Sequence, residues 1–540
     1  MDSDTSSSAT PVDSDTSNGG TRDESQGPAR PRGFRDAIGS ALPKERFGDH
    51  LAILSGTGQN IAGLGVFVVA SLVTTILISR TLHARALGIV TLATQLAFVG
   101  GAATRFGMDM AAVRRVAIDL GKEEPGKVRA VMVRAAAIAA VASAIVALLI
   151  FAGAGALARQ FNGTRTAFEA AALALPFVAL CQVYLGGTRG LKIMRHTLYV
   201  YWAGQPVLWI AAMLVGWTVS KSVGASVFAY AVSWALATLA AWYFWERETA
   251  KFPRLPADPG EVRELVRYGA PRAPAALLAQ LLFWTDYFVF GLYAKGSQLG
   301  VYAAAVRVAQ ALVLFLIAVN YMFSPFVADL HARGERDRLD GLFKALTRWV
   351  VAGSIPILLL LLIVPGPMLR LFGGEFQSGT TPLRILLIGQ SVNVATGSVG
   401  FILIMVGRTG WDLAVYAASF LLDLAVAFLL VPHLHAEGAA IAQAVTLIVS
   451  NGARLYLVWR FVHIQPFNRH YFRLAIPAAV GAGVMIAIHL LLGHAAWPLD
   501  LIATGLAGAV AYGGVLLAVG LTAIERATIR NLAGRLLSRA

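Results

Sequence analysis

Long apolar segments separated by short polar ones dominate the chain from residue 59 onward. An α-helix rises about 1.5 Å per residue, so about 20 apolar residues cross the roughly 30 Å core of a bilayer. The pattern predicts fourteen membrane-spanning helices, at residues 59–79, 86–104, 131–153, 167–187, 199–219, 224–245, 272–293, 299–327, 343–366, 383–406, 412–432, 437–459, 472–492 and 500–522. The expected fold is therefore an all-α polytopic membrane protein.

Composition and charge agree with this prediction. The chain is 57% hydrophobic and 14% charged, whereas soluble domains carry about 25% charged residues. The net charge of +15 does not indicate nucleic-acid binding, because the basic residues are scattered through short loops. With the N-terminus in the cytoplasm, 36 of the 45 Lys and Arg residues fall on the cytoplasmic side, as the positive-inside rule requires. Nine fall outside or in outer half-helices: Arg80, Arg85, Arg159, Arg165, Lys221, Lys295, Arg307, Arg370 and Arg384. We therefore expect an even number of spans in the plasma (inner) membrane, with both termini cytoplasmic.

An internal repeat divides the chain. Leu87-Gly88 matches Leu299-Gly300 at an offset of 212 residues, and Gly224-Ala225 matches Gly438-Ala439 at an offset of 214. Six helices separate the matched positions, so the halves share one orientation, as in parallel repeats related by an axis along the membrane normal. The predicted units are a disordered cytoplasmic tail, two six-helix lobes, and two extra helices with the cytoplasmic C-terminus, at residues 1–50, 51–250, 251–465 and 466–540.

Motifs of catalytic and nucleotide-binding sites are missing from the sequence. It has no Walker A, HExxH or CxxC motif and no nucleophile elbow, and its single cysteine, Cys181, lies in an apolar segment. No enzyme activity, metal or cofactor is expected. Transport would draw on an ion gradient, the membrane potential or consumption of the product.

Two charged residues lie at membrane depth beside the turn at Lys295–Gln298. Asp286 precedes this turn and Arg307 follows it, each in an apolar segment. Ionisable groups within the hydrocarbon are costly and mark function or a buried pair. One interpretation is a structural ion pair between adjacent helices. The other is an arginine that faces a cavity and binds an anionic group, since a guanidinium binds phosphate through two parallel hydrogen bonds and stays charged. Both can hold.

Other polar residues in the apolar segments have a structural and a functional interpretation. Arg105 and Asp109, spaced i,i+4, form either a helix-face pair or a basic rim that receives a phosphorylated substrate. Asp423 has no partner evident in the sequence and is either a titrating carboxyl for ion coupling or a hydrogen-bonding group inside the bundle. The amides of a larger set connect helices or line a polar lumen; among them are Gln310, Asn320, Gln390 and Asn393. Aromatic residues such as Trp209 could stack on sugar rings.

Several stretches of the chain match a known pattern in order and spacing. They are Ile78-Ser-Arg-Thr-Leu…Leu87-Gly88, then Thr285-Asp286…Gly291-Leu…Leu299-Gly-Val-Tyr302…Arg307, then Pro325…Leu330, and last Leu371-Phe-Gly-Gly-Glu-Phe376 with Leu383-Arg-Ile-Leu386…Gly389-Gln390. In these stretches the chain resembles the polysaccharide-biosynthesis or oligosaccharide flippase (Wzx-type) family of the multidrug/oligosaccharidyl-lipid/polysaccharide exporter superfamily. The resemblance covers about residues 50–525.

The resemblance implies two six-helix lobes around a hydrophilic cavity and alternating access. It implies a polyprenyl-pyrophosphate-linked oligosaccharide as substrate, moved from the inner to the outer leaflet for cell-surface polysaccharide biosynthesis. Arg307 would bind the pyrophosphate with Asp286 as partner. The resemblance supports the same role for Arg105 less strongly. Membrane lipids would be further partners, and a polysaccharide polymerase or glycosyltransferases could be. A peptidoglycan precursor (lipid II) flippase and a cation-coupled multidrug exporter remain alternatives.

Overall fold

The computed structural model of this protein describes residues 44–122, 124–253, 260–270, 273–492 and 496–521. Within these ranges it contains helices and no strand. The helices of the first half are α2 (Lys44–Thr104), α3 (Met108–Gly121), α4 (Pro125–Gln160), α5 (Arg165–Gly190), α6 (Arg195–Thr197), α7 (Gln205–Val219) and α8 (Val223–Glu248). Those of the second half are α9 (Glu261–Gly269), α10 (Ala273–Tyr293), α11 (Gln298–Gln310), α12 (Leu314–Ala332), α13 (Arg336–Ile363), α14 (Pro365–Leu369), α15 (Thr380–Thr396), α16 (Val399–Met405) and α17 (Thr409–Val462), followed by α18 (Ala475–Leu492) and α19 (Trp497–Val515).

Length and composition identify eleven described helices that could cross a membrane, or twelve when the bent pair of α15 and α16 counts as one span. Two of the eleven are too long for one crossing. The apolar part of α2 has 42 residues and α17 has 54. Each contains a histidine with a left-handed backbone, His83 (φ 65°) and His435 (φ 52°).

Contacts show that α17 folds back at His435. Asp412 and Arg454 form an ion pair of 3.0 Å, and the Thr446 hydroxyl donates to Asp423 at 3.3 Å. In a straight helix the first pair would lie about 63 Å apart. The segment 412–432 therefore runs antiparallel to the segment 437–459, as the sequence pattern predicts.

The same reasoning applies to α2 around His83. Phe67 contacts Trp202 and Phe98 contacts Trp234, and both tryptophans contact Tyr201. The two halves of α2 thus lie side by side. With both long helices divided, every predicted span falls on a helix or a helix pair, although the count of fourteen itself stays a prediction.

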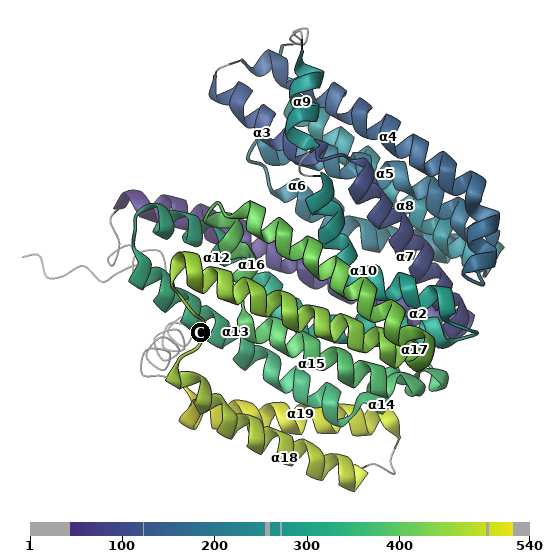
Figure 1. Cartoon of the computed structure of the whole chain (residues 1–540), viewed down its shortest axis with the longest axis vertical. Coiled ribbons are helices and arrows are strands. Elements are labelled where there is room, and N and C mark those ends of the chain that lie inside the picture. Colours follow the sequence, from purple (N-terminus) through teal and green to yellow (C-terminus); the bar gives the residue numbers. More distant parts are fainter. Residues whose placement is uncertain (1–43, 123, 254–259, 271–272, 493–495, 522–540) are drawn as a thin grey trace, which may run out of the picture.

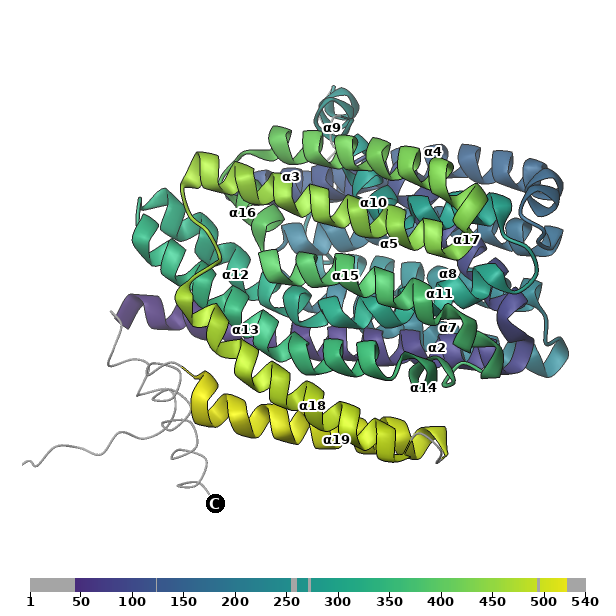
Figure 2. The same ribbon diagram turned by 60° about the horizontal axis from the view of Figure 1, so that its bottom comes forward.

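The helices form two lobes and a flanking hairpin (Figures 1 and 2). Helices α3 to α8 pack with the second half of α2, and α10 to α17 form a second bundle beside them. The α18–α19 hairpin packs on α13, outside both lobes. Arg348 of α13 holds the hairpin by donating hydrogen bonds to the His470 and Gly520 carbonyls.

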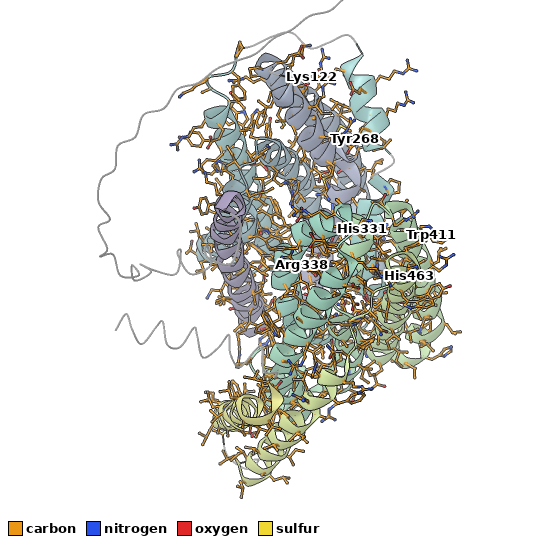
Figure 3. All side chains as sticks on the ribbon, turned by 90° about the vertical axis from the view of Figure 1, so that its left-hand side faces the viewer. Lys122, Tyr268, His331, Arg338, Trp411 and His463 are labelled. Atoms are coloured by element: carbon orange, nitrogen blue, oxygen red, sulfur yellow. The ribbon has the colours of Figure 1, made fainter. Side chains whose placement is uncertain are left out.

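Loops collect at two opposite ends of the bundle. Figure 3 looks onto one of them, which carries Lys122, Tyr268, His331, Arg338, Trp411 and His463 and is called here the Lys122 end. The opposite end, called here the His83 end, carries the break within α2 at His83, the turn between α10 and α11, and the break within α17 at His435. Helix α2 begins at the Lys122 end, and the last described residues return to it beside His470. The described chain therefore crosses the bundle an even number of times.

The buried apolar core shows how the lobes meet. One cluster includes residues of both lobes, from Ile78 to Ala442. Two further clusters lie toward the Lys122 end, one around Met108 and Trp245 of the first lobe and one around Phe323 and Val458 of the second. The lobes thus share a core toward the His83 end and pack separately toward the other.

Two connecting segments lie outside the predicted spans. Residues 44–50 belong to α2 rather than to the predicted disordered tail, and residues 1–43 lie outside the described part of the chain. The short helix α9 between the lobes docks on the first lobe through Arg115–Glu264 (2.9 Å) and Arg134–Glu261 (3.1 Å).

Candidate functional site

A largely enclosed cavity of about 40 Å³ lies between the two lobes, lined by polar side chains and by the apolar Ile78, Leu87 and Val90. The first lobe supplies a row of small polar side chains from both halves of α2, together with Trp209 and Tyr230. The second lobe supplies Arg307 from α11. The α2 residues are Ser71, Thr74, Thr75, Thr91, Thr94 and Gln95. A water molecule needs about 10–15 Å³ by the same measure, so this conformation leaves room for about three waters.

Arg307 is the cation that lines this cavity. Its side chain is half-buried and has no hydrogen-bond or ion-pair partner among the described residues. Tyr230 lines the same cavity from the first lobe. A guanidinium held inside an apolar bundle without a counter-charge is costly. Its N–H donors are therefore open to a ligand that enters the cavity.

The predicted ion pair between Arg307 and Asp286 is wrong for this conformation. The Asp286 carboxylate is fully buried and accepts a hydrogen bond from the Tyr302 hydroxyl. Arg307 follows Tyr302 by five residues, which places it about 140° further around α11. Tyr302 faces α10 and Arg307 faces the first lobe, so one helix cannot direct both toward Asp286.

Asp286 lies instead beside Asp423 of α17. Both carboxyls are fully buried and close enough for their charges to act on each other. One turn away, the Gln443 amide donates to the Phe283 carbonyl at 3.4 Å and holds α17 against α10. Asp286 Oδ1 and Asp423 Oδ2 have no hydrogen-bond partner among the described residues. Ionisable groups at membrane depth are costly, so two buried carboxyls with unpaired oxygens mark this place as a second candidate site.

Polar contacts close the cavity toward the His83 end. Glu375 of the second lobe accepts a hydrogen bond from the Ala84 N–H at 2.8 Å, where the α2 helix restarts after His83. Arg80 of the first lobe donates to the Leu371 carbonyl at 2.9 Å and to the Arg370 carbonyl at 2.6 Å. The His83 imidazole lies 3.8 Å from the Glu375 carboxylate. All these contacts join one lobe to the other.

The remaining predicted site residues do not line the cavity. Arg105 and Asp109 form the predicted i,i+4 pair, at 3.6 Å, toward the Lys122 end. On α15 the Asn393 amide donates to Gln390 at 3.2 Å. Asn320 is buried in α12, and Gln310 ends α11. The structure therefore places Asp286 and Asp423 on the packed helices α10 and α17, leaves Arg307 alone on the cavity, and places the other five predicted residues elsewhere.

Sequence reasoning singled out Trp209 but missed the hydroxyl residues of α2. A signal for them was present. Ser71, Thr74 and Thr75 have the i, i+3, i+4 spacing of one helix face, and Thr91, Thr94 and Gln95 repeat it after the break at His83. Hydroxyl residues are common in contacts between helices, so one such face alone would not identify a cavity. The signal is that both halves of α2 carry the same face.

A family model described as "Polysaccharide biosynthesis protein" matches residues 54–331. This region contains the first lobe, the α9 linker and the segment from Asp286 to Arg307. No curated protein matches the chain.

Solved structures of transporters have the same fold. A lipid II flippase MurJ in an inward closed conformation aligns with a TM-score of 0.67 at 11% identity, over 84% of this chain and 97% of that one. An inward-facing multidrug resistance MATE family transporter of the MOP superfamily aligns with a TM-score of 0.62 at 13% identity, over 74% and 94%. A mutant of the Vibrio cholerae MATE transporter VcmN gives 0.55 at 14% identity, over 76% and 95%. At these identities the likeness concerns the fold.

Proposed function

Because the chain belongs to the polysaccharide biosynthesis protein family, we propose that it moves a polyprenyl-pyrophosphate-linked oligosaccharide from the cytoplasmic to the outer leaflet of the plasma (inner) membrane. The product would enter cell-surface polysaccharide biosynthesis, where a polymerase or glycosyltransferases would act on it. The observation that carries this proposal is Arg307, an unpaired guanidinium on a polar cavity between the lobes. Arginine binds phosphate oxygens through a planar, permanently charged fork, so a lipid pyrophosphate is a ligand of matching charge.

The arrangement of the lobes supports alternating access. The lobes share a core and cross-lobe hydrogen bonds at the His83 end and pack as separate cores at the Lys122 end. Such a bundle opens by parting at the Lys122 end, where fewer contacts must break. The charge bias of the loops supports a cytoplasmic location for that end, so the substrate head would enter from the inner leaflet while its lipid tail stays in the bilayer.

Asp286 and Asp423 are the proposed ion-coupling centre. The pair is buried in the second lobe, while Tyr302 and Arg307 lie on successive turns of α11. Binding of a cation or proton between the carboxyls would change how α10, α11 and α17 pack. Arg307 would then approach or leave the first lobe as the charge of the pair changes.

Delivery of the glycan to the outer leaflet in cells tests this function. Arg307→Ala should reduce delivery about tenfold or more at normal protein levels, because hydrogen bonds to charged groups are worth about 1.5–3 kcal/mol. Arg307→Lys should retain part of it. Arg384→Ala, which removes an exposed arginine of α15, should have no effect. Undiminished delivery by the Arg307→Ala protein would refute the role of Arg307.

A peptidoglycan precursor would use the same cavity and the same arginine. Depletion of the protein in cells distinguishes between the two possible substrates by the phenotype that follows. Loss of a surface polysaccharide with intact growth supports the proposal, whereas lysis with blocked wall synthesis supports the peptidoglycan precursor. A cation-coupled drug exporter would instead extrude cationic drugs, and Asp423 would be its titrating carboxyl.

A further inference from the structure

The two sides of the cavity differ in hydrogen-bonding character. On the first lobe, three threonine hydroxyls donate their protons to carbonyls of their own helix: Thr74 to Ala70, Thr75 to Ser71 and Thr94 to Val90, each at 2.8 Å. A hydroxyl has one proton and two acceptor lone pairs. With the proton engaged, each oxygen offers only an acceptor to the cavity.

The opposite side offers only donors. The Arg307 guanidinium carries five N–H donors and no acceptor, and no described residue takes up these donors. A phosphate group only accepts hydrogen bonds, so it suits Arg307 and does not suit the threonine oxygens. A sugar carries many O–H donors, which the threonine oxygens match.

Aromatic rings extend the acceptor side. Trp209 and Tyr230 line the cavity from the first lobe with ring centroids 4.8 Å apart, edge to face. The indole N–H of Trp209 donates to the Ser226 carbonyl at 3.0 Å, which fixes the ring and leaves its apolar surface for packing. A pyranose has C–H faces that pack on such surfaces while its hydroxyls point outward to acceptors.

We propose that α2, Trp209 and Tyr230 form a sugar subsite, which binds the first sugar of the lipid-linked glycan while Arg307 binds the phosphate. This assignment rests on the proposed function and adds an orientation to it. The phosphate points to the second lobe and the reducing-end sugar to the first. The head group then bridges the lobes and its binding draws them together, so both parts are required for closure around the substrate.

Two ligands of equal charge separate the subsites. One is a short-chain polyprenyl pyrophosphate capped with a methyl group, and the other carries one hexose in place of the methyl. Binding of each to the purified full-length protein in lipid nanodiscs is measured by isothermal titration calorimetry. The wild-type protein should bind the hexose form more tightly.

Thr74→Val and Thr94→Val keep the side-chain shape and remove one acceptor each. Each variant should lose about fivefold affinity for the hexose form and none for the methyl form, as expected for one hydrogen bond. The matched control is Thr104→Val, since Thr104 makes the same bond to Gly100 at 2.8 Å on the same helix and does not line the cavity. Arg307→Gln should weaken both ligands equally.

The outcomes are distinct. Equal losses for both ligands in the threonine variants, or the same loss in Thr104→Val, would overturn the sugar subsite and leave the proposed function standing. If the wild-type protein bound both ligands with equal affinity, the sugar subsite would also be refuted. If it bound neither, the proposed function would fail together with the subsite.

Discussion

Gly88 and Gly300 are the same position in the two sequence repeats, and their backbones are in contact. A Cβ built on Gly88 would lie 2.7 Å from the Gly300 nitrogen, and one built on Gly300 would overlap the Ala84 carbonyl. Equivalent residues of a two-fold repeat touch each other only where the axis passes between them. The axis that relates the lobes therefore passes through this contact at the His83 end, beside the Glu375 and Arg80 hydrogen bonds that close the cavity.

Gly300→Ala should destabilise the contact between the lobes. The new methyl group meets backbone atoms of α2, which cannot rotate away as a side chain could, and such overpacking costs about 1–3 kcal/mol. We expect a melting temperature several degrees lower for the purified protein and slower transport. Gly65→Ala is the matched control, because nothing lies within 4 Å of that position. An unchanged melting temperature in Gly300→Ala would contradict the close packing at the axis.

Glu375→Ala should open the His83 end of the cavity. The carboxylate accepts from the Ala84 N–H and lies near His83, and a hydrogen bond to a charged group is worth about 1.5–3 kcal/mol. The measurement uses a protein with Thr94→Cys, which is labelled by a membrane-impermeant thiol reagent added outside the cell. Labelling at position 94 should be about tenfold faster with Glu375→Ala than without it. The one native cysteine, Cys181, is fully buried and adds little background.

Glu169→Ala serves as the control for this gate. Glu169 pairs with Arg165 at 2.7 Å at the same end, but within the first lobe. Labelling that rises equally in both variants would point to general loosening and against a gate at Glu375.

The fold was largely predictable from the sequence, because apolar length and charge bias act over whole segments. The hairpins at His83 and His435 were placed correctly for this reason, whereas the contact between Gly88 and Gly300 was not predicted. The site was less predictable. Arg307 and Asp286 are close in the sequence and both lie at membrane depth, which suggested an ion pair. Which way a helical residue faces depends on its neighbours in three dimensions, and Tyr302, not Arg307, faces Asp286.

Partners far apart in the sequence were also hidden from it. Asp423 meets Asp286 across 137 residues, and Glu375 meets Ala84 across 291. No local pattern encodes such distances along the chain. The threonine face of α2 was visible in the spacing, but its meaning came only from the arginine on the other side of the cavity.

Asp423→Asn should uncouple transport from its ion gradient. The variant keeps the shape of the side chain and removes one charge from a buried carboxyl pair, so it should stay folded with an unchanged or higher melting temperature. In proteoliposomes, the flipping rate should no longer respond to an imposed proton or sodium gradient.

Asp500→Asn is the control for this prediction. Asp500 is likewise buried and bonded to a threonine and a histidine, but it lies in the α18–α19 hairpin. A gradient response that persists in Asp423→Asn, or is lost only in Asp500→Asn, would exclude the carboxyl pair as the coupling centre.

Arg348→Met should release the α18–α19 hairpin from α13 at the Lys122 end. Arg348 is buried and donates to the His470 carbonyl at 3.2 Å and to the Gly520 carbonyl. Methionine fills similar space without donors, and each carbonyl left unpaired costs about 1–3 kcal/mol. Hydrogen exchange at residues 469–474 and 516–520 should therefore quicken about tenfold or more.

Tyr512→Phe is the control for this prediction. It removes one bond to the Ala352 carbonyl (2.8 Å) in the same interface and should have a smaller, more local effect on hydrogen exchange. Because the hairpin lies outside both lobes and touches no cavity residue, transport should continue in Arg348→Met. Exchange that stays slow would show that apolar packing alone holds the hairpin, and lost transport with normal protein levels would show that the hairpin takes part in the movement of the lobes.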